Sequence, residues 1–181
     1  MEWSDYYFRL VDLVASKSKD PSTKVGCVII GSDHEIRSTG YNGLPRGCKD
    51  DVLYRDVRPT KYYYYEHAER NTIYNATRVG VSLKGCTAYM HSLPCADCAR
   101  GLIQAGITHI VIRSLKSLDR WRESVIAGLT MICESGIIVD CPTTGTDIGI
   151  WLLEGYRSGK VTSGINNGIN NGINNGKVAN V

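Results

Sequence analysis

The sequence lacks any long apolar run and any strong excess of one charge. Its 181 residues include 21 Lys and Arg against 18 Asp and Glu, which gives a formal net charge of +3. No apolar run approaches the ~20 residues that a membrane-spanning helix needs. The mild charge gives no reason to expect a polynucleotide footprint, although it is compatible with a local basic pocket for one phosphate. We therefore expect neither a membrane nor a nucleic acid as a partner.

Seven cysteines are present, an odd number, and no signal peptide is recognisable before Trp3. Both observations favour a reducing, cytoplasmic compartment over a secreted protein held together by disulfides. Four cysteines lie in strand-like or helix-like runs and are expected to be buried apolar residues: Cys27, Cys86, Cys133 and Cys141. Cys48 lies in a polar loop, and its role is left open.

The length and the hydrophobic content of 43% predict one domain with a substantial core, which we place at residues 1–157. Residues 158–181 contain a tandem Gly-Ile-Asn-Asn repeat without the apolar density of a core, which predicts a mobile tail. The alternative is a tail that becomes ordered against a neighbouring subunit. Just upstream, four residues could form a short helix: Ile148, Trp151, Leu152 and Tyr156.

Hydrophobic spacing predicts an α/β domain with a mixed five-stranded sheet. Strands are expected at residues 24–30, 35–41, 86–91, 109–113 and 137–140, and helices at 3–14, 68–79, 96–105 and 121–133. The first two strands form a hairpin. The alternation of strands and helices in the second half implies crossover connections and parallel pairing. The predicted architecture is therefore a three-layer α/β/α fold.

Two helices carry apolar stripes that are expected to face the core. Ser4 is the candidate cap of the first helix. The stripes consist of Trp3, Tyr7, Leu10, Val11 and Val14 on the first helix, and of Trp121, Val125, Leu129, Ile132 and Cys133 on the last.

Three candidate metal ligands, His67, Cys95 and Cys98, lie in two short segments. One imidazole and two thiolates suit zinc, and three protein ligands leave the fourth tetrahedral position open, as in catalytic sites. If Pro94 marks a helix start, the two cysteines lie on one face of its first turn, at the positive end of the helix dipole. His67 and Glu69 can approach one ion only where a strand or loop enters a helix, so we place His67 at a helix start.

Glu69 is the candidate catalytic residue, because a carboxylate beside a ligand but not needed as one can carry protons for the metal site. Moreover, H-x-E followed by P-C-x-x-C is the signature of zinc deaminases, so this assignment is a match to a known motif. The alternative is a structural zinc clip closed by another cysteine, and Glu69 argues against it.

Residues ahead of the zinc motif are the candidates for substrate recognition. Asn42 ends the second strand and can offer a donor and an acceptor to a ligand, although Asn-Gly is also an ordinary turn. The connection at residues 44–66 is unusually long, as functional or disordered loops often are. One tyrosine of residues 62–65 could stack on a base, or all could serve packing alone. Tyr65 and Pro94 complete the predicted substrate-binding set.

For a phosphate, the first candidates are Ser22, Thr23 and Lys24. Two hydroxyls followed by a cation ahead of a strand offer charge-assisted hydrogen bonds. The alternative is a turn with a solvated lysine. Arg46 and Arg113 are less secure candidates.

Six segments together resemble the deoxycytidylate (dCMP) deaminases over about residues 1–142. They are DPSTKVG at 20–26, GYNG at 40–43, Asp50-Asp51, HAE at 67–69, PCADC at 94–98 and QAGI at 104–107. The zinc motifs alone indicate only the wider cytidine deaminase superfamily, whereas GYNG and the long loop narrow the resemblance to the dCMP deaminases. It implies a cytidine deaminase-like fold and zinc-dependent hydrolysis of dCMP to dUMP, which feeds thymidylate synthesis.

The resemblance further implies a hexamer that dCTP activates and dTTP inhibits, with Mg²⁺ accompanying the triphosphate. The family associates the GYNG segment with the effector site, so the candidate effector contacts are Gly40, Tyr41, Asn42, Gly43 and Arg46, of which Asn42 could serve either site. The repeat tail and the tyrosine run depart from the family. A tRNA adenosine deaminase, a free-nucleoside or riboflavin-pathway deaminase, and a zinc-stapled binding module stay open as alternatives.

Overall fold

The computed structural model describes residues 1–115, 117–142 and 154–155. The tail expected at 158–181 and nearly all of the short helix expected before it lie outside the described residues, so the domain boundary at 157 stays a prediction. Within the described part, no helix has the length and apolar character needed to cross a membrane.

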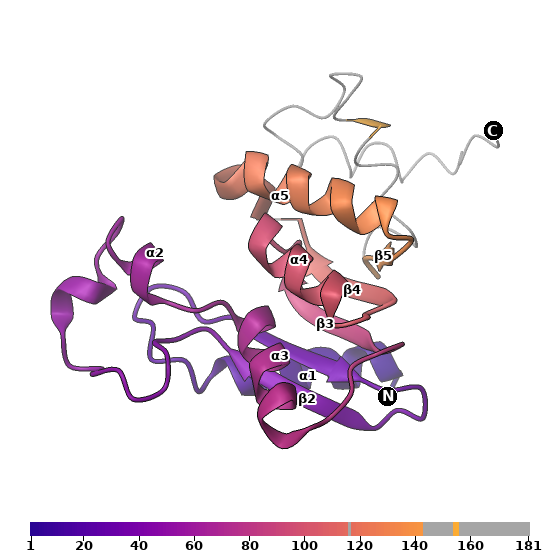
Figure 1. The fold of residues 1–181 in the computed structure, drawn as a ribbon, viewed down its shortest axis with the longest axis horizontal. Coiled ribbons are helices and arrows are strands. Elements are labelled where there is room, and N and C mark those ends of the chain that lie inside the picture. The colour runs from indigo at the N-terminus through magenta and orange to yellow at the C-terminus, as the bar shows by residue number, and fades with distance from the viewer. Residues whose placement is uncertain (116, 143–153, 156–181) are drawn as a thin grey trace.

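A mixed five-stranded sheet in the order β2-β1-β3-β4-β5 forms the centre of the fold (Figure 1). The strands are β1 (Gly26–Ile30), β2 (Ile36–Tyr41), β3 (Thr87–Ser92), β4 (His109–Ser114) and β5 (Ile138–Asp140). β1 pairs antiparallel with β2 and β3, whereas β4 is parallel to β3 and β5. The predicted hairpin and parallel half are confirmed. β1 begins later than expected, because the Val25 N–H bonds the Asn42 side chain instead of a strand.

Helices on both faces complete the predicted three layers. α1 (Trp3–Ala15) covers one face, and α3 (Ala68–Val79), α4 (Ala96–Gln104) and α5 (Ser117–Glu134) lie on the other. Alternation along β1 separates the two cores, as expected for a strand with side chains on opposite faces. Val28 and Ile30 pack with α1, whereas Cys27 and Ile29 join the larger core on the other face.

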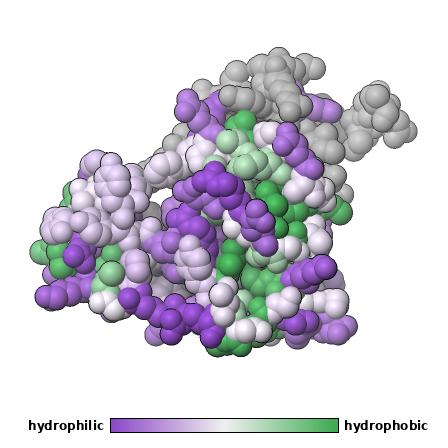
Figure 2. All heavy atoms as spheres, in the orientation of Figure 1, coloured by the Kyte–Doolittle hydropathy of each residue, from purple (hydrophilic) through white to green (hydrophobic). Residues whose placement is uncertain are grey.

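The long connection between β2 and α3 contains a 3₁₀ turn, η1 (Leu53–Asp56), and a short helix, α2 (Lys61–Tyr64). It projects from the body of the molecule in Figure 1. Figure 2 shows mainly hydrophilic or intermediate side chains over this segment, with a small hydrophobic patch at its edge. The long connection therefore contains helical turns and also exposes a large surface.

Three side chains lie elsewhere than the sequence pattern predicts. Trp3 is 52% exposed and stacks on His34 of the β1–β2 turn, with ring centroids 4.1 Å apart, instead of joining the core. Trp121 is 38% exposed because the backbone leaves the helical conformation there, at φ −119° and ψ 30°. Ser4 is not the cap, since α1 already begins at Trp3 and Glu2 occupies the cap position.

The cysteine predictions are confirmed for Cys27, Cys86 and Cys141, which are buried. Cys133 is only partly buried, because it lies at the margin of the core face of α5. Cys48 is exposed, and all seven cysteines are free thiols.

Gly40 allows α3 to lie directly against β2. A Cβ atom at this position would lie 2.4 Å from the Thr72 nitrogen and 2.6 Å from the Ala68 oxygen, both backbone atoms of α3. Ser38 Oγ donates a hydrogen bond of 2.7 Å to the Thr72 oxygen, and Asn71 Nδ2 donates one of 2.8 Å to the Tyr41 oxygen. β2 therefore sets the position of the first turns of α3.

Candidate zinc centre and adjoining cavity

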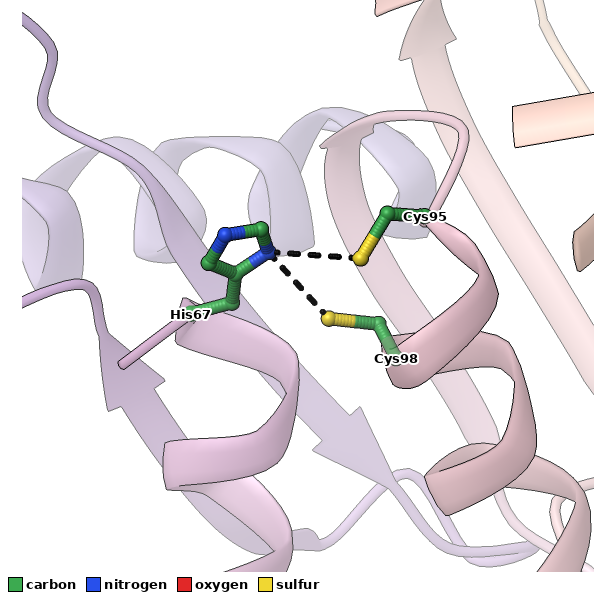
Figure 3. A group of neighbouring side chains, drawn as sticks. All are labelled: His67, Cys95 and Cys98. Atoms are coloured by element: carbon green, nitrogen blue, oxygen red, sulfur yellow. Dashed lines mark hydrogen bonds between the residues drawn. The ribbon is translucent and has the colours of Figure 1, made fainter. Parts of the chain in front are cut away.

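Three side chains converge from the starts of two neighbouring helices (Figure 3). His67 is the N-cap of α3, which confirms its predicted place, while Cys95 is the N-cap of α4 and Cys98 lies in its first turn. His67 Nδ1 lies 3.5 Å from Cys95 Sγ and 3.4 Å from Cys98 Sγ. A tetrahedral zinc ion with Zn–N of about 2.05 Å and Zn–S of about 2.3 Å separates nitrogen and sulfur by about 3.6 Å. The spacing therefore fits zinc, with Nδ1 as the nitrogen ligand.

The surroundings act in opposite directions on the two thiols. A hydrogen bond from the Cys98 thiol, helped by the His67 imidazole, overcomes burial and lowers the pKa of Cys95 to about 3. The same hydrogen bond, together with burial, raises the pKa of Cys98. One thiolate is thus present at neutral pH, and binding of a metal ion to both sulfurs would release the remaining proton.

No fourth ligand lies beside these three within the described residues: the cluster contains His67, Cys95 and Cys98, with no further histidine, cysteine or carboxylate. This composition is that of an open, catalytic zinc site and not of a closed structural one.

Glu69 lies in the first turn of α3 and lines the same cavity as His67 and Cys95. It is only 7% exposed. None of the hydrogen bonds and ion pairs found among the described residues uses its carboxylate. Glu69 is therefore a buried acid next to the ligand set whose oxygens remain available to a substrate.

A cavity of about 440 Å³ is lined by two of the three ligands, His67 and Cys95. Part of its lining is apolar and comes from Leu93, Trp121 and Val125. Tyr62 from α2 meets Trp121 from α5 edge to face, with ring centroids 4.8 Å apart at 82°. The kink that exposes Trp121 thus places its ring in the cavity lining, where the long connection and α5 meet.

A second part of the lining is polar and consists of Asp20, Thr23, Asn42, Arg58 and Lys61, which we call the polar wall. Asp20 is 2% exposed, and its Oδ2 accepts hydrogen bonds from Lys61 Nζ at 2.5 Å and Asn42 Nδ2 at 3.1 Å. Burial alone would raise the pKa of Asp20, but the donors around it, led by Lys61, lower it below its usual value. Asp20 is therefore an ionised, buried partner of Lys61.

Arg58 is the second cation of the polar wall. Its Nη2 atom lies 3.3 Å from both Ser22 Oγ and Thr23 Oγ1, and its side chain is exposed. Lys61 is paired with Asp20, whereas no described acid pairs with Arg58. Of the two Lys and Arg side chains that line the described cavity, Arg58 is thus the one whose charge is not already balanced.

Of the predicted substrate contacts, Thr23, Asn42 and Tyr65 line the cavity. The Asn42 amide is already engaged: Oδ1 accepts from the Val25 N–H at 2.7 Å, and Nδ2 donates to Asp20 and to the Thr23 oxygen. The Tyr65 hydroxyl donates to Asp56 at 2.6 Å. Asn42 therefore orders the wall instead of pointing free groups at a ligand.

The other predicted contacts do not belong to the cavity lining. Ser22 hydrogen-bonds Lys61 and Arg58, which do line it. Pro94 is buried and Lys24 is exposed, and neither belongs to the lining. Arg113 is bound by Asp12 of α1 at 2.7 Å, on the opposite face of the sheet. In the polar wall, Lys61 and Arg58 occupy the place that the sequence suggested for Lys24.

The sequence reasoning missed several residues of the cavity, among them Asp20, Arg58, Lys61 and Trp121. Asp20 stands in the recognised 20–26 segment, which could have singled it out. Arg58 and Lys61 were visible only as charges of a long loop, because nothing local shows that the loop folds back onto residues 22–23.

The ligand set at two helix starts, the free glutamate and the surrounding sheet together define a zinc-dependent deaminase. Residues 1–114 match the family model for the cytidine and deoxycytidylate deaminase zinc-binding region. Human deoxycytidylate deaminase is 42% identical over 124 residues, which cover 66% of this chain and 68% of the human protein, and the mouse enzyme is 41% identical over the same length. The chain belongs to the deoxycytidylate deaminase family.

The fold is similar to that of dCMP deaminase from the cyanophage S-TIM5. Its structures in the apo form and in complex with dCMP and dUMP give TM-scores of 0.60 and 0.62 at 22% identity. The matches cover 75% and 76% of this chain and 94% of the phage chain in each case. At this identity the similarity concerns the fold, and it confirms the predicted cytidine deaminase-like architecture.

Proposed function

We propose that this protein hydrolyses dCMP to dUMP and ammonia. The observation that carries this proposal is one cavity lined by two zinc ligands, His67 and Cys95, by the buried acid Glu69, and by a polar wall that presents the unbalanced cation Arg58. Deamination of a pyrimidine requires the zinc ligands and Glu69. Binding of a 5′-phosphate requires a cation such as Arg58, whereas binding of a free nucleoside does not.

The residues fit the protons that this reaction moves. His67, Cys95 and Cys98 would hold the zinc ion, which when bound supplies Lewis-acid activation for the attack of water on C4 of the cytosine ring. Glu69 accepts a proton from that water and delivers it to N3, and then carries the second proton to the departing amino group. The water oxygen ends on C4, and its two protons end on N3 and on ammonia.

The phosphate is assigned to Arg58 and the hydroxyl of Thr23. A guanidinium offers two parallel N–H donors to phosphate oxygens. We expect Arg58→Ala to raise KM for dCMP about 10- to 150-fold, because a hydrogen bond to a charged group contributes about 1.5–3 kcal/mol. Initial rates of ammonia release over a range of dCMP concentrations measure this change.

Lys24→Ala is the matched control, since it removes a cation that is next to Thr23 in the sequence but lies outside the cavity lining. We expect it to leave KM for dCMP within about threefold of the wild type, as surface substitutions usually have small effects. A large rise in KM for Lys24→Ala and none for Arg58→Ala would show that Lys24, and not Arg58, binds the phosphate.

We further propose that effectors act through residues 40–46, with dCTP activating, dTTP inhibiting and Mg²⁺ accompanying the triphosphate, in a cytoplasmic homo-hexamer. Tyr41 is 41% exposed, and the Arg46 side chain hydrogen-bonds Asn75 of α3. Gly43 and Glu66 exchange two backbone hydrogen bonds of 3.0 and 2.8 Å directly before His67. A ligand on Tyr41 or Arg46 would thus contact a segment tied to the helix that carries Glu69, which supports a regulatory role.

A substrate panel tests this function. Ammonia release is measured from dCMP, deoxycytidine, cytidine and dCTP with zinc supplied, and each series is repeated with Mg²⁺ and either dCTP or dTTP as effector. We expect dCMP to be the best substrate, with a sigmoidal rate curve that dCTP makes hyperbolic and dTTP suppresses. Equal rates with deoxycytidine would indicate a nucleoside deaminase instead.

A further inference from the structure

We propose that Asp20 is the positioning residue that makes the cavity selective for a phosphomonoester, because it neutralises Lys61 and leaves Arg58 as the phosphate-binding cation. This proposal rests on the proposed function and deepens it. It assigns different roles to the two cations of the polar wall. Lys61 holds the wall together, and Arg58 binds the ligand.

The Asp20 carboxylate gathers three separate parts of the chain. Oδ1 accepts hydrogen bonds from the Ser22 N–H at 2.8 Å, the Ser22 hydroxyl at 2.9 Å and the Thr23 N–H at 3.1 Å. Oδ2 accepts from Asn42 Nδ2 and Lys61 Nζ. One buried side chain therefore sets the relative positions of the loop before β1, the end of β2 and the start of α2.

Lys61 and Asp20 form a buried ion pair, with side chains that are 6% and 2% exposed. Removing one partner of such a pair leaves an uncompensated buried charge, which is strongly unfavourable. Lys61 also donates to Ser22 Oγ at 2.8 Å, so two of its three donor positions are engaged within the protein. The ammonium of Lys61 is thus committed to Asp20 and Ser22.

Arg58 differs from Lys61 in exposure and in its partners. Its guanidinium hydrogen-bonds the hydroxyls of Ser22 and Thr23, and both of these residues are held by Asp20. With the Lys61 charge balanced, the polar wall carries one net positive charge, on Arg58. A phosphate monoester carries a charge of about −1.5 to −2 at neutral pH and can accept hydrogen bonds from the guanidinium and the neighbouring hydroxyl together.

Whether Lys61 holds the wall together or binds the phosphate can be tested by removing the charges of Asp20 and Lys61 singly and together. Lys61→Met alone leaves the Asp20 carboxylate unpaired in the same wall as the substrate phosphate, so we expect KM for dCMP to rise about 30-fold or more. The double variant Asp20→Asn/Lys61→Met also removes the uncompensated carboxylate, so it should bring KM down from the value of Lys61→Met to that of Asp20→Asn alone. If Lys61 bound the phosphate directly, the double variant would stay as impaired as Lys61→Met.

Asp20→Asn alone tests the positioning role. We expect KM for dCMP to rise about 10-fold or more, with kcat within about threefold and a much smaller change of kcat/KM for deoxycytidine, because the lost charge organises the polar wall and deoxycytidine has no phosphate to bind there. Asp50→Asn is the control, since this acid is exposed and pairs with Lys19 outside the cavity lining. Equal losses on dCMP and deoxycytidine, with a fall in Tm, would show a purely structural role and overturn the proposal.

Binding measurements separate this proposal from the proposed function. Calorimetry with dUMP and with inorganic phosphate reports the phosphate contacts without turnover. Weaker binding of both ligands to Asp20→Asn, and tighter binding to the double variant than to Lys61→Met, supports the positioning role even if the wild type releases no ammonia from dCMP. Unchanged binding of both ligands to Asp20→Asn contradicts the positioning role even if the wild type is an active dCMP deaminase.

Discussion

Replacing Glu69 with glutamine is expected to lower kcat for dCMP by about 10²- to 10⁴-fold, the usual contribution of a general acid–base residue. Glutamine has nearly the shape of glutamate but cannot accept the proton that water loses or deliver one to the ring and the amine. The zinc content should stay at the wild-type value, because the ligand cluster among the described residues does not include Glu69. Ammonia release and zinc per chain, measured on the same preparation, check both halves of this prediction.

Glu134→Gln is the matched control for this experiment, since it makes the same chemical change at an exposed position at the end of α5. Its activity should equal that of the wild type. Near-normal turnover in Glu69→Gln would refute the proton-carrying role. Loss of zinc from Glu69→Gln would instead identify this acid as a metal ligand.

Replacing Cys95 with alanine is expected to remove the metal and with it more than about 10³-fold of the activity, since Lewis-acid activation contributes several kcal/mol. His67 Nδ1 lies at the distance from each sulfur that one tetrahedral ion requires, so the loss of one sulfur leaves two protein ligands. Elemental analysis after dialysis against a weak chelator should find zinc in the wild type and almost none in the variant.

Cys48→Ala is the control for the loss of a thiol, because Cys48 is exposed and lies outside the cluster. It should keep both zinc and activity. Zinc that remains bound in Cys95→Ala, with full occupancy, would mean that another side chain completes the site, as in a structural clip.

Local pattern was sufficient for most of the fold. α3 begins and ends where its apolar spacing and the HAE segment place it, and the parallel pairing in the second half follows from alternating strands and helices. The pattern failed at Trp3 and Trp121 because both stand near a helix end or kink. There the helical period no longer tells which way a side chain points.

The zinc ligands could be recognised from the sequence because H-x-E followed by P-C-x-x-C matches a known motif, and the local geometry agrees with that match. Cys95 and Cys98 lie at a helix start, and His67 lies at another. What the residues could not supply was the distance between the two helix starts, which depends on the packing of α3 against β2 and α4.

The two cations of the polar wall, in contrast to the zinc ligands, could not be identified from the sequence. Lys24 was proposed for the phosphate because it follows Ser22 and Thr23 in the chain, whereas Lys61 and Arg58 reach the same hydroxyls from more than 30 residues away. An ion pair such as Asp20–Lys61 leaves no periodic or local signal, since its free energy comes from burial and through-space charge.

The sequence by itself therefore determined the α/β class, the order of its elements and the candidate zinc ligands with Glu69, because these depend on periodicity and on a recognisable motif. Only the tertiary structure decided which acid is buried, which cation stays available and which aromatic rings line the cavity. These features arise where the loop before β1, the end of β2, the long connection and α5 meet in space.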